Sequence, residues 1–141
     1  MTDNSVLLDT GPLVALMLAS DAQHQRCVET LATIKPPLLT CWPVITEAAW
    51  LLRQQHRPLD RITEAHAAGV FRLLPLDGDD LAAISAIMGR YEDLGLQLAD
   101  AALIHLAERE SVRTVFTTDR RDFSVVRLKR NRSLKLLPDI Q

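Results

Sequence analysis

Four acidic residues stand at positions where this chain otherwise places apolar side chains. Asp9 and Asp119 each end a short, mostly apolar run, whereas Glu47 and Asp100 each lie on the apolar stripe of a predicted helix. Carboxylates on core-facing positions are costly unless something neutralises them. Four that converge are most simply neutralised by a hard divalent cation such as Mg2+ or Mn2+. These residues make the chain a candidate for metal-assisted chemistry on phosphate esters.

The four acids are expected to meet at one edge of a sheet. In open parallel sheets, sites form beyond the carboxyl ends of the strands, near a topological switch point. Asp100 precedes Leu103, Ile104 and Ala107 by three, four and seven positions, so it shares their helix face. Glu47 shares the apolar face of its own helix in the same way. Both lie near the start of their helices, where the helix dipole favours negative charge.

Each acid also has a structural interpretation. Asp9 precedes a Thr-Gly-Pro sequence and can be a turn or N-cap residue. Glu47 can be a first-turn partner of the helix dipole. Asp119 can begin a short turn. Asp100 stands between alanines with no evident capping task, so its structural interpretation is the weakest. Four independent structural roles would have to coincide, and the conjunction therefore favours a metal site.

Further polar residues flank these acids. Asp122 follows Asp119 by three positions, so one helical turn would place it on the same side as a peripheral ligand or substrate contact. Asp93 is more simply a residue that caps or closes a loop. Three threonines offer hydroxyl groups that can orient a carboxylate; they are Thr10, Thr117 and Thr118. Threonine is also a good strand former, so a structural role is preferred for each of them.

Other chemistries find little support in the chain. It has no Gly-rich phosphate loop with Lys, no dinucleotide fingerprint and no Gly-x-Ser-x-Gly elbow. Cys27 and Cys41 have no metal-ligand spacing. The histidines are scattered and are interpreted as surface or packing residues; they are His24, His56, His66 and His105.

Charge is unevenly distributed along the 141 residues, which fit a single domain, 1–141. Residues 1–119 carry 16 acidic and 9 basic side chains, whereas residues 120–141 carry 7 basic and 2 acidic ones. This basic end can hold a polyanion beside an acidic metal site, or it can be a solvated strand and tail. Its cations are Arg120, Arg121, Arg127, Lys129, Arg130, Arg132 and Lys135.

Nothing in the sequence indicates a membrane segment or a secretory signal. Residues 1–4 lack a positively charged region, and the longest apolar run, 12–19, is too short to span a bilayer. Two thiols in a chain of this size weakly suggest a reducing compartment. A soluble cytoplasmic protein is expected.

Short apolar runs alternate with helical patterns along the chain. This alternation predicts an α/β fold with a mostly parallel sheet covered on both faces. Strands are expected at 5–8, 38–41, 70–76, 114–118 and 134–137. Helices are expected at 11–19, 21–34, 43–52, 60–68, 77–90 and 97–110.

Four segments together resemble a known family. They are LLDTGPLVAL around Asp9, TEAAWLL around Glu47, LADAALIHLAE around Asp100 and TTDRRDF around Asp119. In order, spacing and flanking residues, the chain resembles PIN-domain proteins of the VapC-like toxin ribonuclease group over nearly its whole length. The resemblance implies a three-layer α/β/α sandwich with a mostly parallel five-stranded sheet. It also implies Mg2+- or Mn2+-dependent cleavage of RNA, a cognate antitoxin protein as partner, and a homodimer.

The resemblance extends to individual residues. Asp9, Glu47, Asp100 and Asp119 match the four metal-site acids of the family, whereas Asp122 falls where the family varies. In-line attack of water would then leave a 5′-phosphate and a 3′-hydroxyl. Arg120, Arg121 and the basic end would hold flanking phosphates. For the homodimer, the apolar side chains of the first helix offer a surface, although they serve a core equally well; they are Leu13, Leu16, Met17 and Leu18.

Three alternatives stay open. The first is a degenerate PIN-like module that binds RNA or protein without catalysis, although four intact acids argue against decay. A haloacid-dehalogenase-like phosphatase also begins with Asp after strand one, but it needs a second Asp where this chain has Gly11. A receiver-like signalling module would pair two adjacent acids and place a Lys after its last strand, and neither feature is evident.

Overall fold

A five-stranded sheet forms the centre of the protein in the computed structural model, which describes residues 4–139. Its strands are β1 (Val6–Leu8), β2 (Leu38–Thr40), β3 (Phe71–Leu73), β4 (Thr114–Phe116) and β7 (Lys135–Leu137). They lie in the order β3-β2-β1-β4-β7, and every neighbouring pair is parallel. The predicted parallel five-stranded sheet is confirmed.

The strand order contains one reversal of direction, and this reversal positions the candidate site. The chain proceeds from β1 to β2 and β3 on one side, then returns past β1 to β4 and β7 on the other. Leu8 of β1 pairs with Phe116 of β4, so the carboxyl ends of these two strands meet. Such a switch point leaves a crevice beyond the strand ends, because the flanking connections diverge there.

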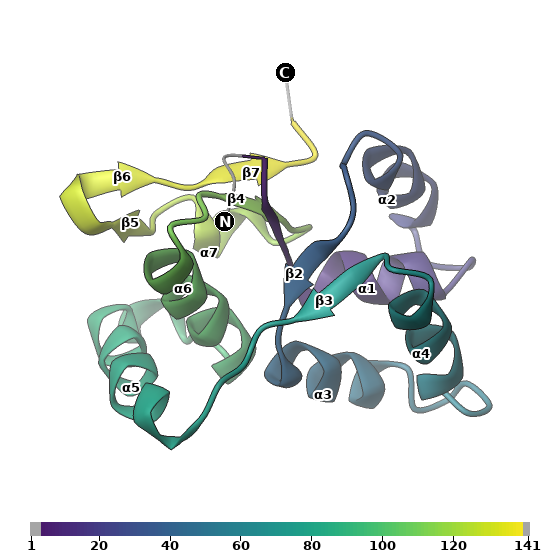
Figure 1. Cartoon of the computed structure of the whole chain (residues 1–141), viewed down its shortest axis with the longest axis horizontal. Helices are drawn as coiled ribbons and strands as arrows, with labels where there is room; N and C mark the ends of the chain where they lie inside the picture. The colour runs from purple at the N-terminus through teal and green to yellow at the C-terminus, as the bar shows by residue number, and fades with distance from the viewer. Residues whose placement is uncertain (1–3, 140–141) are drawn as a thin grey trace.

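Helices cover both sides of the sheet, in agreement with the predicted three-layer sandwich. Figure 1 shows α1, α2 and α4 on one side and α5 and α6 on the other. Right-handed crossovers require this change of side when the strand order reverses. The α-helices are α1 (Thr10–Met17), α2 (His24–Leu31), α3 (Trp42–Leu51), α4 (Leu59–Ala67), α5 (Leu81–Arg90), α6 (Leu98–Glu110) and α7 (Arg120–Phe123).

Local sequence explains where several helices begin and end. Asp77 and Asp80 form a capping box at the short 3-10 turn η1 (Gly78–Asp80), which leads into α5. A second 3-10 turn, η2 (Glu92–Leu94), ends at Gly95 with φ of 63°, a left-handed conformation that glycine adopts easily. Pro43 lies in the first turn of α3, where its missing N–H costs nothing.

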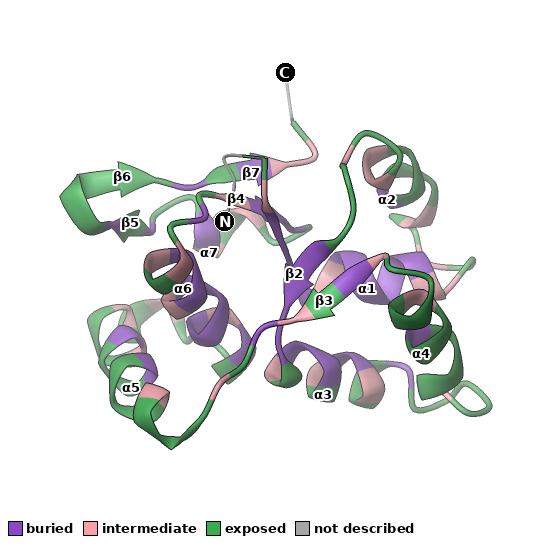
Figure 2. Cartoon of the chain, in the orientation of Figure 1, coloured by how far each residue is buried: buried purple, intermediate pink, exposed green. Residues whose placement is uncertain are grey.

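The apolar core extends from the strands into the inner faces of the helices. The central strands β1, β2 and β4 and the inner face of α6 are mostly buried, whereas α2 and α4 are largely exposed on their outer faces (Figure 2). In α1, Leu13 and Leu16 are buried, and Met17 and Leu18 pack against the core half-buried. The core role is therefore confirmed for Leu13 and Leu16. A dimer surface that uses the partly exposed Met17 and Leu18 stays a prediction.

Differences from the sequence prediction concentrate at strand ends and in the last 20 residues. The strands span three residues each; the third predicted strand was too long because Pro75 has no N–H for the ladder. The second helix begins at His24, three residues after Asp21. A small antiparallel hairpin of β5 (Arg127–Leu128) and β6 (Arg132–Ser133), joined by the turn η3 (Lys129–Asn131), was not predicted.

Candidate active site

Asp9 is a carboxylate enclosed by protein at the end of the central strand. Its residue is only 3% exposed, and its backbone N–H donates to the carbonyl of Phe116, 3.0 Å away. Burial raises the pKa of Asp9 from 3.8 to about 7, and the charges of Asp100 and Glu47 contribute further. Asp9 is the N-cap residue of α1, yet its side chain makes no capping hydrogen bond. The carboxylate is therefore held for something other than helix capping.

Thr117 is the residue that fixes the Asp9 carboxylate. Its hydroxyl donates to Oδ2 of Asp9 at 2.7 Å, and the backbone N–H of Asp119 donates to the same hydroxyl oxygen at 2.9 Å. Thr117 is completely buried. The structure thus shows this threonine orienting a carboxylate, the alternative that the sequence analysis ranked second. Thr117 directly follows β4, whereas the sequence prediction had placed it inside a strand at 114–118. The one sequence signal for it is a hydroxyl residue two positions before an acid.

Asp100 has a capping role that the sequence interpretation denied it. As the third residue of α6, it accepts a hydrogen bond from the N–H of Gln97 at 3.0 Å and completes a capping box. Even so, burial raises its pKa from 3.8 to about 6, with further contributions from the charges of Glu47, Asp119 and Asp122. Asp100 therefore stabilises the start of α6 through Oδ2, and its charge is at the same time repelled by the neighbouring acids.

The four predicted acids and Asp122 form one electrostatic group. The charge of Glu47 raises the pKa of both Asp9 and Asp100, and the charge of Asp119 raises that of Asp100. The pKa of Asp122 is raised by burial first, then by the charge of Asp119 and by a hydrogen bond between the two carboxyl groups. Asp122 therefore belongs with this group. Asp93 lies apart, in the turn η2.

The acids are close enough to repel one another but are not arranged as a ready metal cage. Within residues 4–139, no three Asp, Glu, His or Cys side chains are positioned to hold one ion. Two of the carboxylates are turned toward protein donors, Asp9 toward Thr117 and Asp100 toward Gln97.

Two buried polar atoms beside the acids lack hydrogen-bond partners. They are Oδ1 of Asp9 and the hydroxyl oxygen of Thr10. A buried oxygen without a partner costs about 1–3 kcal/mol, more if it is charged. A hard cation accepts oxygen ligands of these types and would also relieve the carboxylate repulsion. The residues present thus fit a divalent cation in donor type and charge.

A small hollow of about 130 Å³ adjoins the acidic edge through Thr117, whose hydroxyl holds Asp9; none of the five acids lines it. It is lined by Gln23, Arg26, Thr117, Thr118, Arg120 and Pro138. Arg120 is fixed there, because it donates to the carbonyl of Pro138. Arg26 and Gln23 come from α2, which no sequence pattern placed near this edge. Two arginines beside a carboxylate group provide a position for phosphate oxygens.

Most of the basic C-terminal segment lies elsewhere. Arg120 and Arg121 begin α7 directly after Asp119, but Lys129, Arg130, Arg132 and Lys135 line a different hollow, together with residues at the starts of β1 and β4. Strands β4 and β7 run parallel, so their starts lie at the same end of the sheet. Lys135, which begins β7, is therefore at the opposite end from Asp119, which follows β4. The expectation that the whole segment flanks the acidic site is therefore wrong.

Two histidines and both cysteines are held by contacts within the protein. His24 contacts the carbonyl of Ala15 at 2.7 Å, and His105 contacts Asp80 at 2.8 Å. Both cysteines are buried free thiols, and burial raises the pKa of Cys41 to about 11. The contacts of His24 and His105 agree with the surface or packing role predicted for the histidines. Within residues 4–139, no helix has the length and apolarity needed to cross a bilayer.

Known proteins resemble this chain in sequence or in fold. Ribonuclease VapC26 of Mycobacterium tuberculosis is 28% identical over 125 residues, which are 86% of this chain and 92% of that protein. The crystal structure of VapC20 from the same organism, described as a toxin that cleaves the sarcin-ricin loop, matches with a TM-score of 0.75 and 22% identity. It covers 84% of this chain and 92% of its own. A toxin-antitoxin complex from Klebsiella pneumoniae matches with a TM-score of 0.68 and 20% identity, over 86% of this chain and 92% of its own.

The profile of one family covers most of the chain. The PIN domain profile matches residues 6–129, a span that begins at β1, ends just beyond β5 and contains all five acids. The resemblance inferred from the four acidic segments is thereby confirmed. On this match, together with the parallel sheet and its acidic switch point, the chain belongs to the PIN domain family.

Proposed function

We propose that this protein is a metal-dependent endoribonuclease, the toxin of a toxin-antitoxin pair, with residues 1–141 forming one nuclease domain. The observation that carries the proposal is the buried carboxylate of Asp9, which has an unpartnered oxygen and lies among acids that raise its pKa. A fold alone does not specify chemistry, whereas a buried carboxylate in this state must be neutralised, either by a proton or by a bound cation. A relative of similar length that is named a ribonuclease supports the choice of reaction.

In this proposal, the metal ligands are Asp9, Glu47, Asp100 and Asp119. Asp122 is coupled to Asp119 and would stand at the margin. A bound Mg2+ or Mn2+ supplies charge neutralisation, polarises the scissile phosphate and lowers the pKa of an attacking water. Carboxylate oxygens are the ligands that both ions prefer.

The protein's own groups would position the RNA. Arg120 and Arg26 border the small hollow beside the acids and can contact the oxygens of a phosphate next to the scissile bond. In the reaction, a water oxygen forms a bond to phosphorus and the bond to the 3′-oxygen breaks. The leaving oxygen takes up a proton, so a 3′-hydroxyl and a 5′-phosphate result. Thr117 holds Asp9 in a fixed orientation throughout.

The direct test is RNA cleavage by the purified, partner-free protein. A mixed cellular RNA pool is incubated with Mg2+, Mn2+ or EDTA, beside Asp100→Asn and the control Asp93→Asn, an exposed acid away from the site. Cleavage that needs metal, survives Asp93→Asn and disappears in a folded Asp100→Asn protein is expected. A folded Asp100→Asn variant with wild-type cleavage would refute the assignment. Mg2+ binding and RNA binding without cleavage would favour the non-catalytic PIN-like module instead.

The partners in this proposal are RNA, a cognate antitoxin and a second copy of the chain, in the cytoplasm. An antitoxin would enter the acidic crevice, and an Arg from it would pair with the carboxylates. For the homodimer, α3 exposes more apolar surface than α1: Trp42 and Trp50 are each 63% exposed, four residues from Thr46 on either side. Sedimentation equilibrium at micromolar concentration tests this, and a monomer would contradict it.

A further inference from the structure

A second hollow, of about 760 Å³, lies at the end of the sheet opposite the acids. Its lining includes the residue before β1, the first residue of β4 and the first residue of β7, which is Lys135. The acids follow the carboxyl ends of β1 and β4, whereas these residues stand at the amino ends of parallel strands. The two sites therefore occupy opposite edges of the same sheet.

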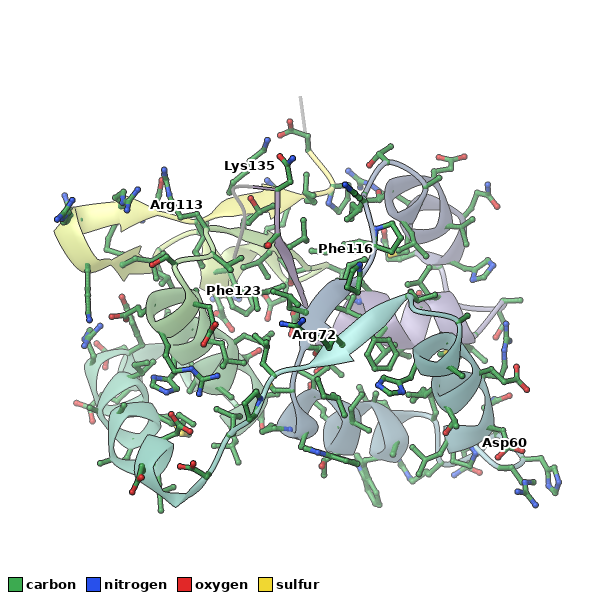
Figure 3. The ribbon with its side chains drawn as sticks, in the orientation of Figure 1. Asp60, Arg72, Arg113, Phe116, Phe123 and Lys135 are labelled. Atoms are coloured by element: carbon green, nitrogen blue, oxygen red, sulfur yellow. The ribbon has the colours of Figure 1, made fainter. Side chains whose placement is uncertain are left out.

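Five cations surround this hollow, which we call the basic pocket. They are Arg113, Lys129, Arg130, Arg132 and Lys135. Arg113 and Lys135 lie on the same side of the molecule as the β5–β6 hairpin (Figure 3). One acidic side chain, Glu108, also lines the pocket, and it is 3.7 Å from Arg90 outside the pocket. The pocket therefore carries a strong excess of positive charge.

None of these five cations has an ion-pair partner within residues 4–139. Arg113 donates to the carbonyl of Ser133 and so ties the hairpin to β4. Within residues 4–139, the side chains of the other four make no hydrogen bond or ion pair. Like charges gathered without partners repel one another, and a bound polyanion would relieve this repulsion.

The pocket is held in place by the core. Leu128 of β5 and Leu134, which follows β6, are both buried, and β5 packs against α6. Between these anchors, the turn η3 presents Lys129 and Arg130 to solvent, with Arg130 in a left-handed conformation at φ of 66°. The cations thus stand on an anchored hairpin, and a ligand there would not have to order a free tail.

We propose that the basic pocket binds backbone phosphates of an RNA segment remote from the scissile bond. The proposal rests on the ribonuclease function proposed above and extends it to substrate choice. Lys and Arg side chains release condensed counterions when they contact nucleic-acid phosphates, which supplies affinity independent of sequence. Arg113 to Asp119 spans six positions, so the two sites are on the order of 20 Å apart at a strand rise of about 3.3 Å per residue. An RNA that contacts both must be long or folded.

An acidic protein partner fits this pocket less well than RNA. Protein interfaces are anchored by buried aromatic and large apolar side chains. In residues 4–139, none of the large apolar side chains that are exposed lines the pocket; they are Val28, Trp42, Trp50, Leu51, Leu59, Leu81, Leu98 and Val125. The pocket offers charge without an apolar anchor, which matches a phosphate backbone.

The test compares two charge-matched double variants in binding. Lys129→Glu with Arg132→Glu removes two pocket cations; Lys35→Glu with Arg72→Glu makes the same change at two exposed cations outside the pocket. Both pairs are made in the Asp100→Asn background, in EDTA. Binding of a labelled 30-nucleotide hairpin RNA is followed by fluorescence anisotropy over a range of salt concentrations. We expect at least a tenfold loss of affinity for the pocket pair, a shallower salt dependence, and less than a threefold loss for the control pair.

Several outcomes separate this proposal from the one on which it rests. Equal RNA affinity in the two pairs would overturn the basic pocket, whether or not the wild-type protein cuts RNA. A loss of RNA affinity that is confined to the pocket pair supports RNA binding by the basic pocket. If the wild type in that case cuts no RNA, only the nuclease proposal fails. Loss of binding to a poly-glutamate peptide, with RNA affinity intact, would assign the pocket to an acidic protein and overturn our proposal. Circular dichroism verifies that every variant is folded. The milder pair Lys129→Gln with Arg132→Gln should show an intermediate loss of RNA affinity.

Discussion

The hydroxyl of Thr117 donates to Oδ2 of Asp9 across 2.7 Å, joining two residues that are 108 positions apart. The same hydroxyl oxygen accepts the N–H of Asp119. One threonine thereby links a proposed ligand at the end of β1 to another beyond β4. Removing a group that orients a metal ligand in this way typically lowers metal affinity by about 10- to 100-fold.

Replacing Thr117 with Val should weaken Mg2+ binding by about tenfold or more, because the isosteric side chain cannot hold Asp9. Its hydrogen bond lowers the pKa of Asp9, so the pH at which Mg2+ binding is half-complete should also move upward. Isothermal titration calorimetry at several pH values measures both. Thr63→Val, at an exposed position in α4, is the matched control. Unchanged affinity and an unchanged pH midpoint in Thr117→Val would contradict the orienting role.

In the absence of metal, Asp9 should make the protein less stable as pH rises from about 4 to about 7. Its pKa is 3.8 ordinarily and about 7 in the folded state, so the folded state keeps a proton that the unfolded state releases over this range. The proton held by Asp9 therefore stabilises the folded state at low pH. This contribution to the free energy of unfolding, on the order of 4 kcal/mol, is lost by pH 7. Asp100, with a pKa of about 6, acts in the same direction.

This pH dependence is measured as Tm between pH 4.5 and 8 in EDTA. Asp9→Asn removes the titrating group, so the Tm difference between variant and wild type should grow in favour of the variant as pH rises. Added Mg2+ should stabilise the wild type more at pH 8 than at pH 5, because the cation needs the ionised carboxylate. A pH-independent Tm difference would show that Asp9 is ionised throughout.

Gly11→Ala should destabilise the protein through a single contact. A Cβ at Gly11 would overlap the hydroxyl oxygen of Thr118, while the Cβ of Thr118 would remain at an ordinary 3.5 Å. Thr118 is exposed, so its side chain can rotate away from the new Cβ, and the expected cost is on the order of 1 kcal/mol. Adding Thr118→Ala to Gly11→Ala removes the overlapping atom and should restore most of the lost stability. Chemical denaturation of the four proteins in this cycle gives the coupling energy, and strict additivity would mean that the strain lies elsewhere.

Asp80→Ala should lower Tm and reduce the protein's resistance to acid. Asp80 accepts hydrogen bonds from the backbone of Asp77 and from His105 and Arg109 of α6, and these bonds lower its pKa from 3.8 to about 2. A lowered folded pKa means that the stabilisation is present above pH 3.8 and is lost as pH falls toward 2. Asp79→Ala, the neighbouring exposed acid, is the control. Identical acid-unfolding midpoints for wild type and Asp80→Ala would refute this.

The parallel sheet and the acidic group were accessible from sequence because each depends on short-range patterns. Apolar runs such as Val6–Leu8 specify buried strands, and an acid at the end of a buried strand falls at the carboxyl edge whatever the loops do. The helix carrying Asp100 was recognisable from its periodicity. Its cap was not, because Gln97 is an uncommon N-cap residue and the bond runs from a backbone N–H to the third position of the helix.

Long-range placement could not be obtained in the same way. Arg26 reaches the acidic edge only because α2 packs on α1, and no local pattern encodes that contact. The basic residues after Asp119 follow one another in sequence, but α7 and the hairpin carry them from one edge of the sheet to the other. Adjacency in the chain was a poor guide to adjacency in space there.

The pairing of β1 with β4 also determines when the candidate site can exist. Leu8 aligns with Phe116, so more than a hundred residues must be synthesised before Asp9 has its hydrogen-bond partner. Contacts this distant in sequence form slowly, because loop closure precedes any stabilisation. Domains fold during synthesis from the N-terminal side, and a chain still being translated would carry Asp9, Glu47 and even Asp100 without an assembled acidic group. Whatever activity resides there is therefore postponed until the last strands have emerged from the ribosome.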